Sequence, residues 1–127
     1  MNMPFVREQG SGPGLVCFHS NCSSSGQYRE LMDTLAGHFH VLAFDAYGAG
    51  KTPAWSHSTY LSLSDEVALA EAVMLQAGEP VILVGHSYGA AVALMTALAN
   101  PARIQAVVVY EPTLFSLVNQ VHAAPNG

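Results

Sequence analysis

Short apolar runs alternate along this chain with stretches whose apolar residues recur at helical spacing. Continuous apolar runs rich in β-branched residues cover residues 14–18, 39–44, 81–84 and 104–110. Runs of this length predict strands that are buried on both faces. A further edge strand is expected around residues 5–7, within an N-terminal segment that is otherwise polar and rich in Gly and Pro.

Amphipathic helices are predicted between these strands. Ser24 and Gln27 have the spacing of a capping box, and Gly37 supplies the end of the helix that follows them. Ser62 is the expected N-cap of the next helix, which Gly78 closes. Each of these two helices has one apolar stripe, so each should cover one face of a sheet.

The pattern after residue 87 predicts a different kind of helix. Residues 88–99 are apolar nearly all round, which predicts heavy burial, and a last short helix is expected to begin at Thr113. Strands that alternate with helices form right-handed crossover units. The sequence therefore predicts an α/β fold over residues 1–127, a single domain with a mostly parallel sheet in a three-layer sandwich.

The composition excludes several function classes. Half of the 127 residues are hydrophobic, and the net charge of -5 includes four scattered Lys and Arg, which argues against a nucleic-acid partner. No run approaches the ~18 apolar residues of a membrane span, and the N-terminus lacks a signal-peptide core. Cys17 and Cys22 lack metal or disulfide-framework spacing, so we expect free thiols, no metal, no cofactor and a cytoplasmic location.

Polar residues follow the ends of the predicted strands. His19-Ser20-Asn21 comes after the first buried strand, Asp45 after the second, Ser87 after the third and Glu111 after the fourth. Because the carboxyl ends of parallel strands meet at one edge of a sheet, these residues are expected to gather there and form a site.

The segment Gly85-His86-Ser87-Tyr88-Gly89 lies between a predicted strand and a predicted helix. Its two glycines let strand and helix approach closely, and so tight a turn forces Ser87 into a strained conformation at the helix N-terminus. Backbone N–H groups and the helix dipole favour negative charge at that point. This strand–turn–helix resembles the nucleophile elbow of the α/β-hydrolase fold family, with Ser87 as the nucleophile.

The resemblance covers about residues 14–118 and implies further roles. His19-Ser20-Asn21 is similar to the family's His-Gly-x segment, which implies that the N–H groups of Asn21 and Tyr88 form the oxyanion hole. By the same resemblance His19 braces this loop, and Asp45 bonds the N–H groups of neighbouring loops. His86, within the elbow, is expected to point away from the substrate.

The acid and the base of a catalytic triad are less well defined. After Ser87 the chain holds one acid, Glu111, and one histidine, His122. Glu111 stands where some members of the family keep their acid, but it would equally suit a polar residue at a strand end. His122 follows the family's order of serine, acid and histidine, although the family's histidine comes after two further strands. The chain thus looks like the N-terminal half of a family member, ending as the cap begins.

Two function classes follow from these residues. The first is a serine hydrolase that cleaves an ester or related acyl bond (including a C–C bond) of a small molecule through Ser87, without a cofactor. The alternative is a catalytically silent binding or interaction domain that lacks the triad histidine. The last predicted strand leaves an open sheet edge, which predicts a homodimer or completion of the site by a second chain.

Overall fold

The computed structural model describes residues 3–112 of the chain. The helix predicted from Thr113 lies outside these residues. All four strands predicted as buried are present, but the burial predicted for residues 104–110 is wrong, because no residue of that strand is buried at the edge of the described sheet. The edge strand expected near residue 5 is the first element of the sheet. The elements, with η for a 3₁₀ turn, are β1 (Val6–Gln9), β2 (Gly14–Phe18), η1 (Ser25–Tyr28), α1 (Arg29–Leu35), β3 (His40–Phe44), α2 (Leu63–Ala77), β4 (Val81–His86), α3 (Tyr88–Ala99), η2 (Pro101–Arg103) and β5 (Ile104–Tyr110).

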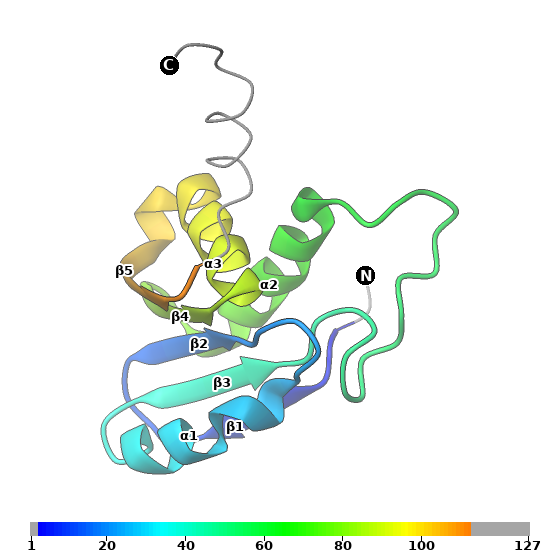
Figure 1. Ribbon diagram of the computed structural model, residues 1–127. Coiled ribbons are helices and arrows are strands. Elements are labelled where there is room, and N and C mark those ends of the chain that lie inside the picture. Colours follow the sequence, from blue (N-terminus) through cyan, green and yellow to red (C-terminus); the bar gives the residue numbers. More distant parts are fainter. Residues whose placement is uncertain (1–2, 113–127) are drawn as a thin grey trace.

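The strands form one sheet in the order β1-β3-β2-β4-β5 (Figure 1). The short strand β1 runs antiparallel to β3, and every other neighbouring pair is parallel. Phe18 pairs with both Phe44 and Gly85, and His86 pairs with Tyr110. The carboxyl ends of β2, β3, β4 and β5 are therefore in register at one edge, as predicted.

Helices cover both faces of this sheet. Figure 1 shows α1 on one face, with α2 and α3 on the other. Alternate residues of β2 point to opposite sides, so Val16 packs with the α2 and α3 residues while Cys17 packs with Met32 of α1. The predicted three-layer α/β architecture is confirmed.

The two predicted helix starts had different outcomes. Ser62 caps α2 as expected and forms a capping box with Asp65. Ser24 also acts as an N-cap, because its Oγ accepts the N–H of Gly26 at 3.3 Å. The capping box expected between Ser24 and Gln27 is wrong, since the segment begins as a 3₁₀ turn and the Gln27 amide bonds Ser20 and His86 instead.

Helix α3 is less buried than its apolar sequence predicted. One side, with Ala90, Ala93 and Thr96, is fully buried against the sheet and α2. On the other side Leu98 is 76% exposed and Met95 is 41% exposed. The helix packs on β4 and on β5, which is the last strand of the described sheet, so within residues 3–112 no element covers its far side.

Candidate active site

Ser87 lies at the junction of β4 and α3. Its backbone has φ 57° and ψ -120°, a left-handed conformation that costs a residue other than glycine on the order of 1–3 kcal/mol. Its neighbours hold this conformation, because the Ser87 N–H donates to the Tyr110 carbonyl at 3.2 Å and its own carbonyl accepts the N–H of Ala90 at 3.0 Å. The strained turn predicted for Ser87 is thus confirmed, and it places the residue at the N-terminus of α3.

The two glycines of the turn sit where a side chain would collide with backbone. A Cβ on Gly85 would lie 2.6 Å from the Cα of Ala90, where α3 crosses β4. A Cβ on Gly89 would lie 2.3 Å from the His19 carbonyl oxygen and 2.4 Å from that of Phe18. The predicted close approach is confirmed, and it presses the first turn of α3 against the end of β2.

The loop of residues 19–24 leaves β2 beside this turn. His19 is buried, and its Nε2 accepts the N–H of Ala46 at 3.0 Å. A backbone N–H can only donate, so Nε2 carries no proton and Nδ1–H must donate to the Ser20 carbonyl, 2.7 Å away. His19 braces the loop as expected, and both of its ring nitrogens are used in doing so.

This bracing controls the direction of the predicted oxyanion donor. The Ser20 carbonyl and the Asn21 N–H belong to one peptide group, and in a trans peptide they point in opposite directions. By fixing the carbonyl, His19 fixes the axis along which the Asn21 N–H points. The side chain of Asn21 is exposed at the surface.

Tyr88, the second predicted donor, is the first residue of α3. Its hydroxyl donates a hydrogen bond to the Glu66 carboxylate of α2. Burial raises the pKa of Glu66, and burial together with the neighbouring carboxylate raises the pKa of Tyr88. Sequence reasoning missed Glu66, although a signal existed: Glu66 lies three residues after Leu63 and four before Ala70, on the apolar stripe of α2.

A pocket of about 190 Å³ adjoins the two predicted donors. Asn21, Tyr88 and Glu66 line it together with residues of the 19–24 loop and the loop after β3. A smaller cavity of about 30 Å³ shares Tyr88 and Glu66 with this pocket and is also lined by the ends of β2 and β3. Pockets that hold drug-sized ligands span roughly 300–1,000 Å³, so the pocket beside the two predicted donors is smaller than that range.

His86 and Glu111 lie on another part of the rim. His86 Nε2 is 3.0 Å from Glu111 Oε1, His86 Nδ1 is 2.7 Å from Gln27 Nε2, and the ring stacks on Tyr110 at 4.3 Å. The Glu111 side chain is 78% exposed, and its backbone has φ 49°. The structure therefore brings Glu111 to His86, and His122 lies outside the described residues.

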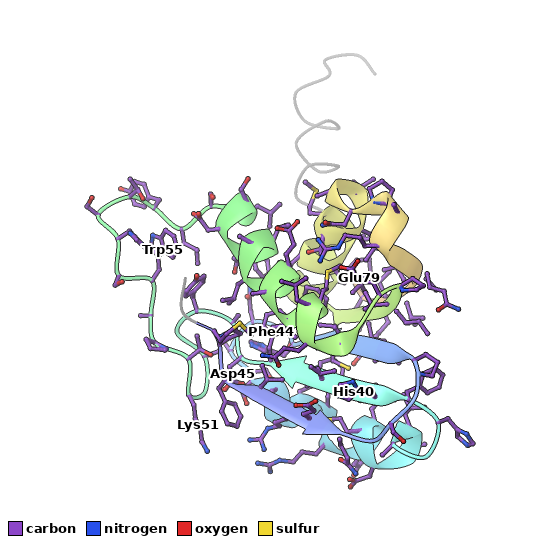
Figure 2. The ribbon with its side chains drawn as sticks, turned by 180° about the vertical axis from the view of Figure 1, so that it is seen from behind. His40, Phe44, Asp45, Lys51, Trp55 and Glu79 are labelled. Atoms are coloured by element: carbon purple, nitrogen blue, oxygen red, sulfur yellow. The ribbon has the colours of Figure 1, made fainter. Side chains whose placement is uncertain are left out.

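Asp45 holds the loops around the site together. It is buried at the end of β3, and its carboxylate accepts the N–H of Ser25 at 2.7 Å and that of Lys51 at 2.9 Å. Burial alone would raise the pKa of Asp45, but these hydrogen bonds outweigh it and lower the pKa. Figure 2 shows Asp45 at the base of the loop that carries Lys51 and Trp55. The structural role expected for Asp45 is confirmed.

Two structural features are absent from the described residues. Among residues 3–112 no group of three or more His, Cys, Asp or Glu side chains is placed to hold a metal ion. Over the same residues no helix is long and apolar enough to cross a membrane.

The comparisons with known proteins agree with this geometry. The family model described as alpha/beta hydrolase fold matches residues 13–125. The chain is 36% identical to a haloalkane dehalogenase of Agrobacterium fabrum over 109 residues, which are 84% of this chain and 35% of that protein. It is 32% identical to a 2-(acetamidomethylene)succinate hydrolase of Mesorhizobium japonicum, over 85% of this chain and 38% of that protein.

A solved structure of E-2-(acetamidomethylene)succinate hydrolase superposes with a TM-score of 0.77 at 30% identity, over 95% of this chain and 46% of that one. The chain thus spans less than half the length of each of these relatives. The match of the family model extends over most of the chain and includes every strand of the sheet from β2 onward. The chain belongs to the α/β-hydrolase fold family.

Proposed function

We propose that this chain carries the nucleophile and oxyanion hole of a serine hydrolase that cleaves an ester or related acyl bond of a small molecule. The observation that carries the proposal is the strained Ser87 at the N-terminus of α3. Strain of this kind persists only where surrounding contacts hold it, and it concentrates at functional sites. The names of the relatives, among them a haloalkane dehalogenase, an epoxide hydrolase and a 2-(acetamidomethylene)succinate hydrolase, support hydrolysis of a small molecule.

The proposed reaction proceeds in two steps. The Ser87 Oγ attacks the acyl carbonyl while a base takes its proton, and the carbonyl oxygen becomes an oxyanion that accepts the N–H groups of Asn21 and Tyr88. Collapse of this intermediate expels the leaving group, which takes the proton back, and leaves an acyl ester on Ser87. Water then attacks this ester by the same route and releases the acid. Each oxyanion donor is worth on the order of 10²–10³ in rate.

Glu111 is the proposed acid of this hydrolase. It follows β5, the strand next to the elbow, and its carboxylate already accepts a hydrogen bond from an imidazole, that of His86. An acid of this kind orients its histidine and stabilises the imidazolium that forms. The base remains a prediction, because His122 lies outside the described residues. The whole protein's substrate is likewise a proposal, since the chain covers only 32–38% of its curated relatives.

The test is an intact-mass measurement after incubation of the 127-residue chain with a fluorophosphonate. We expect one adduct on the wild-type chain and on Ser64→Ala, a control at an exposed serine in α2, and none on Ser87→Ala. An adduct that survives in Ser87→Ala would contradict the assignment of the nucleophile.

A second candidate function is a binding domain without catalysis. It is favoured by the fact that His19 and His86, the histidines nearest to the elbow, each bond other groups through both ring nitrogens. The same measurement separates the two functions. A chain that is folded by circular dichroism yet forms no adduct supports the binding domain.

The predicted homodimer and cytoplasmic location also stay proposals. The dimer is supported by β5, the edge strand, on which Val108 is 55% and Tyr110 47% exposed. Sedimentation equilibrium tests it, and a monomer at all accessible concentrations would contradict it. The location is supported by the free thiols of Cys17 and Cys22.

A further inference from the structure

The side chain of Gln27 lies between the 19–24 loop and the nucleophile elbow. Its Oε1 accepts the Ser20 N–H at 2.9 Å and lies 3.2 Å from the Ser20 hydroxyl. Its Nε2 lies 2.7 Å from Nδ1 of His86, 59 positions along the chain. One amide therefore spans the two segments that carry Asn21 and Ser87.

The direction of every hydrogen bond in this chain of contacts follows from one fact. The Ser20 N–H can only donate, so the atom of Gln27 that faces it must be the oxygen and the atom that faces His86 must be the NH₂ group. His86 Nδ1 is then an acceptor and carries no proton. The proton of the neutral ring lies on Nε2 and donates to Glu111 at 3.0 Å.

The ring of His86 is also fixed in its plane. It stacks on Tyr110 with an interplanar angle of 8°, and the Tyr110 carbonyl accepts the N–H of Ser87. His86 thus stacks on the residue whose carbonyl accepts the N–H of Ser87, and the contact with Gln27 links this position to Ser20. Together with His19, which holds the Ser20 carbonyl, Gln27 fixes both peptide groups that precede Asn21.

We propose that Gln27 is a positioning residue. Through its contact with His86, it holds the peptide groups before Asn21 in a fixed position relative to the nucleophile elbow. The inference rests on the function proposed above, in which the Asn21 N–H serves as an oxyanion donor. An oxyanion hole acts only when its donors are aimed at the developing charge before the reaction begins. Here the aim depends on a side chain of η1, an element that adjoins neither donor in the sequence.

The test uses three variants of the 127-residue chain. Gln27→Met keeps the length of the side chain and removes both hydrogen bonds, whereas Gln27→Glu keeps an acceptor for the Ser20 N–H. Gln76→Met, at an exposed glutamine of α2, is the matched control. Amide hydrogen exchange at Ser20, imidazole nitrogen shifts of His86 and the rate of fluorophosphonate labelling are measured for each.

We expect the Ser20 amide to exchange at least about tenfold faster in Gln27→Met than in wild type, as loss of one hydrogen bond dictates. The amides of β2 and β4 should be unchanged, and Gln27→Glu should restore the protection at Ser20. His86 of the wild type should carry its proton on Nε2. Labelling of Ser87 should slow about tenfold in Gln27→Met under conditions where circular dichroism shows the variant fully folded, and Gln76→Met should match the wild type.

Unaltered exchange at Ser20 in Gln27→Met, or a proton on Nδ1 of His86, would overturn the proposed coupling. So would labelling of Gln27→Met at the wild-type rate. A wild-type chain that is never labelled contradicts the proposed hydrolase instead, and in that case the exchange of Ser20 and the tautomer of His86 still decide whether Gln27 couples the two segments.

Discussion

Gly89→Ala tests how closely the elbow is built against the end of β2. The added Cβ would meet two carbonyl oxygens, 2.3 and 2.4 Å away, both of them backbone atoms. Ordinary contact begins near 3.4 Å, so α3 and the end of β2 must separate by about 1 Å. Neither oxygen sits on a flexible side chain, and the whole segment from Phe18 to His19 has to move.

The size of the effect follows from two opposing contributions. Alanine in place of glycine inside a helix favours the helix by about 1 kcal/mol. Overpacking against a rigid neighbour costs about 1–3 kcal/mol, and backbone contacts at 2.3 Å place Gly89 at the upper end of that range. We expect a net loss of about 2 kcal/mol in the free energy of unfolding, measured by urea titration.

The same shift should reach the site. The His19 carbonyl and the loop that bears Asn21 move with the end of β2, and a displacement of about 1 Å lowers reactivity by on the order of 10²-fold. Gly37→Ala is the control, because no atom lies within 4 Å of its added Cβ and its backbone is not left-handed. If Gly89→Ala matched the control in both stability and fluorophosphonate labelling, the close approach inferred at the elbow would be refuted.

Three further changes have distinct expected outcomes. Asp45→Asn leaves a buried N–H without its acceptor, so it should lower the free energy of unfolding by about 1–3 kcal/mol at pH 7. Because the folded-state pKa of Asp45 is lowered, the difference from wild type should shrink below about pH 4. Urea titrations measure this difference, and a constant difference would argue against this role. Glu66→Gln should be at least as stable as wild type at pH 7. The raised pKa of Glu66 means that its protonated form stabilises the folded chain below about pH 4.3, and that this stabilisation is lost as the pH rises. A lower free energy of unfolding of Glu66→Gln at pH 7 would contradict this. Leu98→Lys should change the free energy of unfolding by less than about 0.5 kcal/mol, as Leu98 is 76% exposed, and a larger loss would mean that the residue is covered in solution.

The strands and the elbow could be predicted because their signals are local. A continuous apolar run defines β2, a nearly continuous one defines β5, and the turn between β4 and α3 needs glycine at two positions for steric reasons. The strained conformation predicted for Ser87 follows from the same steric argument, and the structure shows it as a positive φ of 57°.

The errors arose where distant contacts override local chemistry. Gln27 has the spacing of a capping residue, but its side-chain amide bonds the Ser20 N–H and His86 instead of the N-cap residue. Leu98 belongs to a helix that is apolar on every side, and its exposure depends on β5 being the last strand of the described sheet. The sequence of one helix or loop alone predicts neither the partners of Gln27 nor the exposure of Leu98.

The bracing of the Ser20 peptide groups has a consequence for how the site can change. Ser20 stands where the His-Gly-x segment of the family has glycine. The shape of the 19–24 loop is set by the side chains of His19 and Gln27, which bond the Ser20 peptide groups. Because side-chain hydrogen bonds hold this loop, a single substitution can remove one of them and weaken the loop by about 1 kcal/mol. Substitutions remote from Ser87 can therefore raise or lower the reaction rate of the proposed hydrolase in small steps while its nucleophile and its fold stay the same.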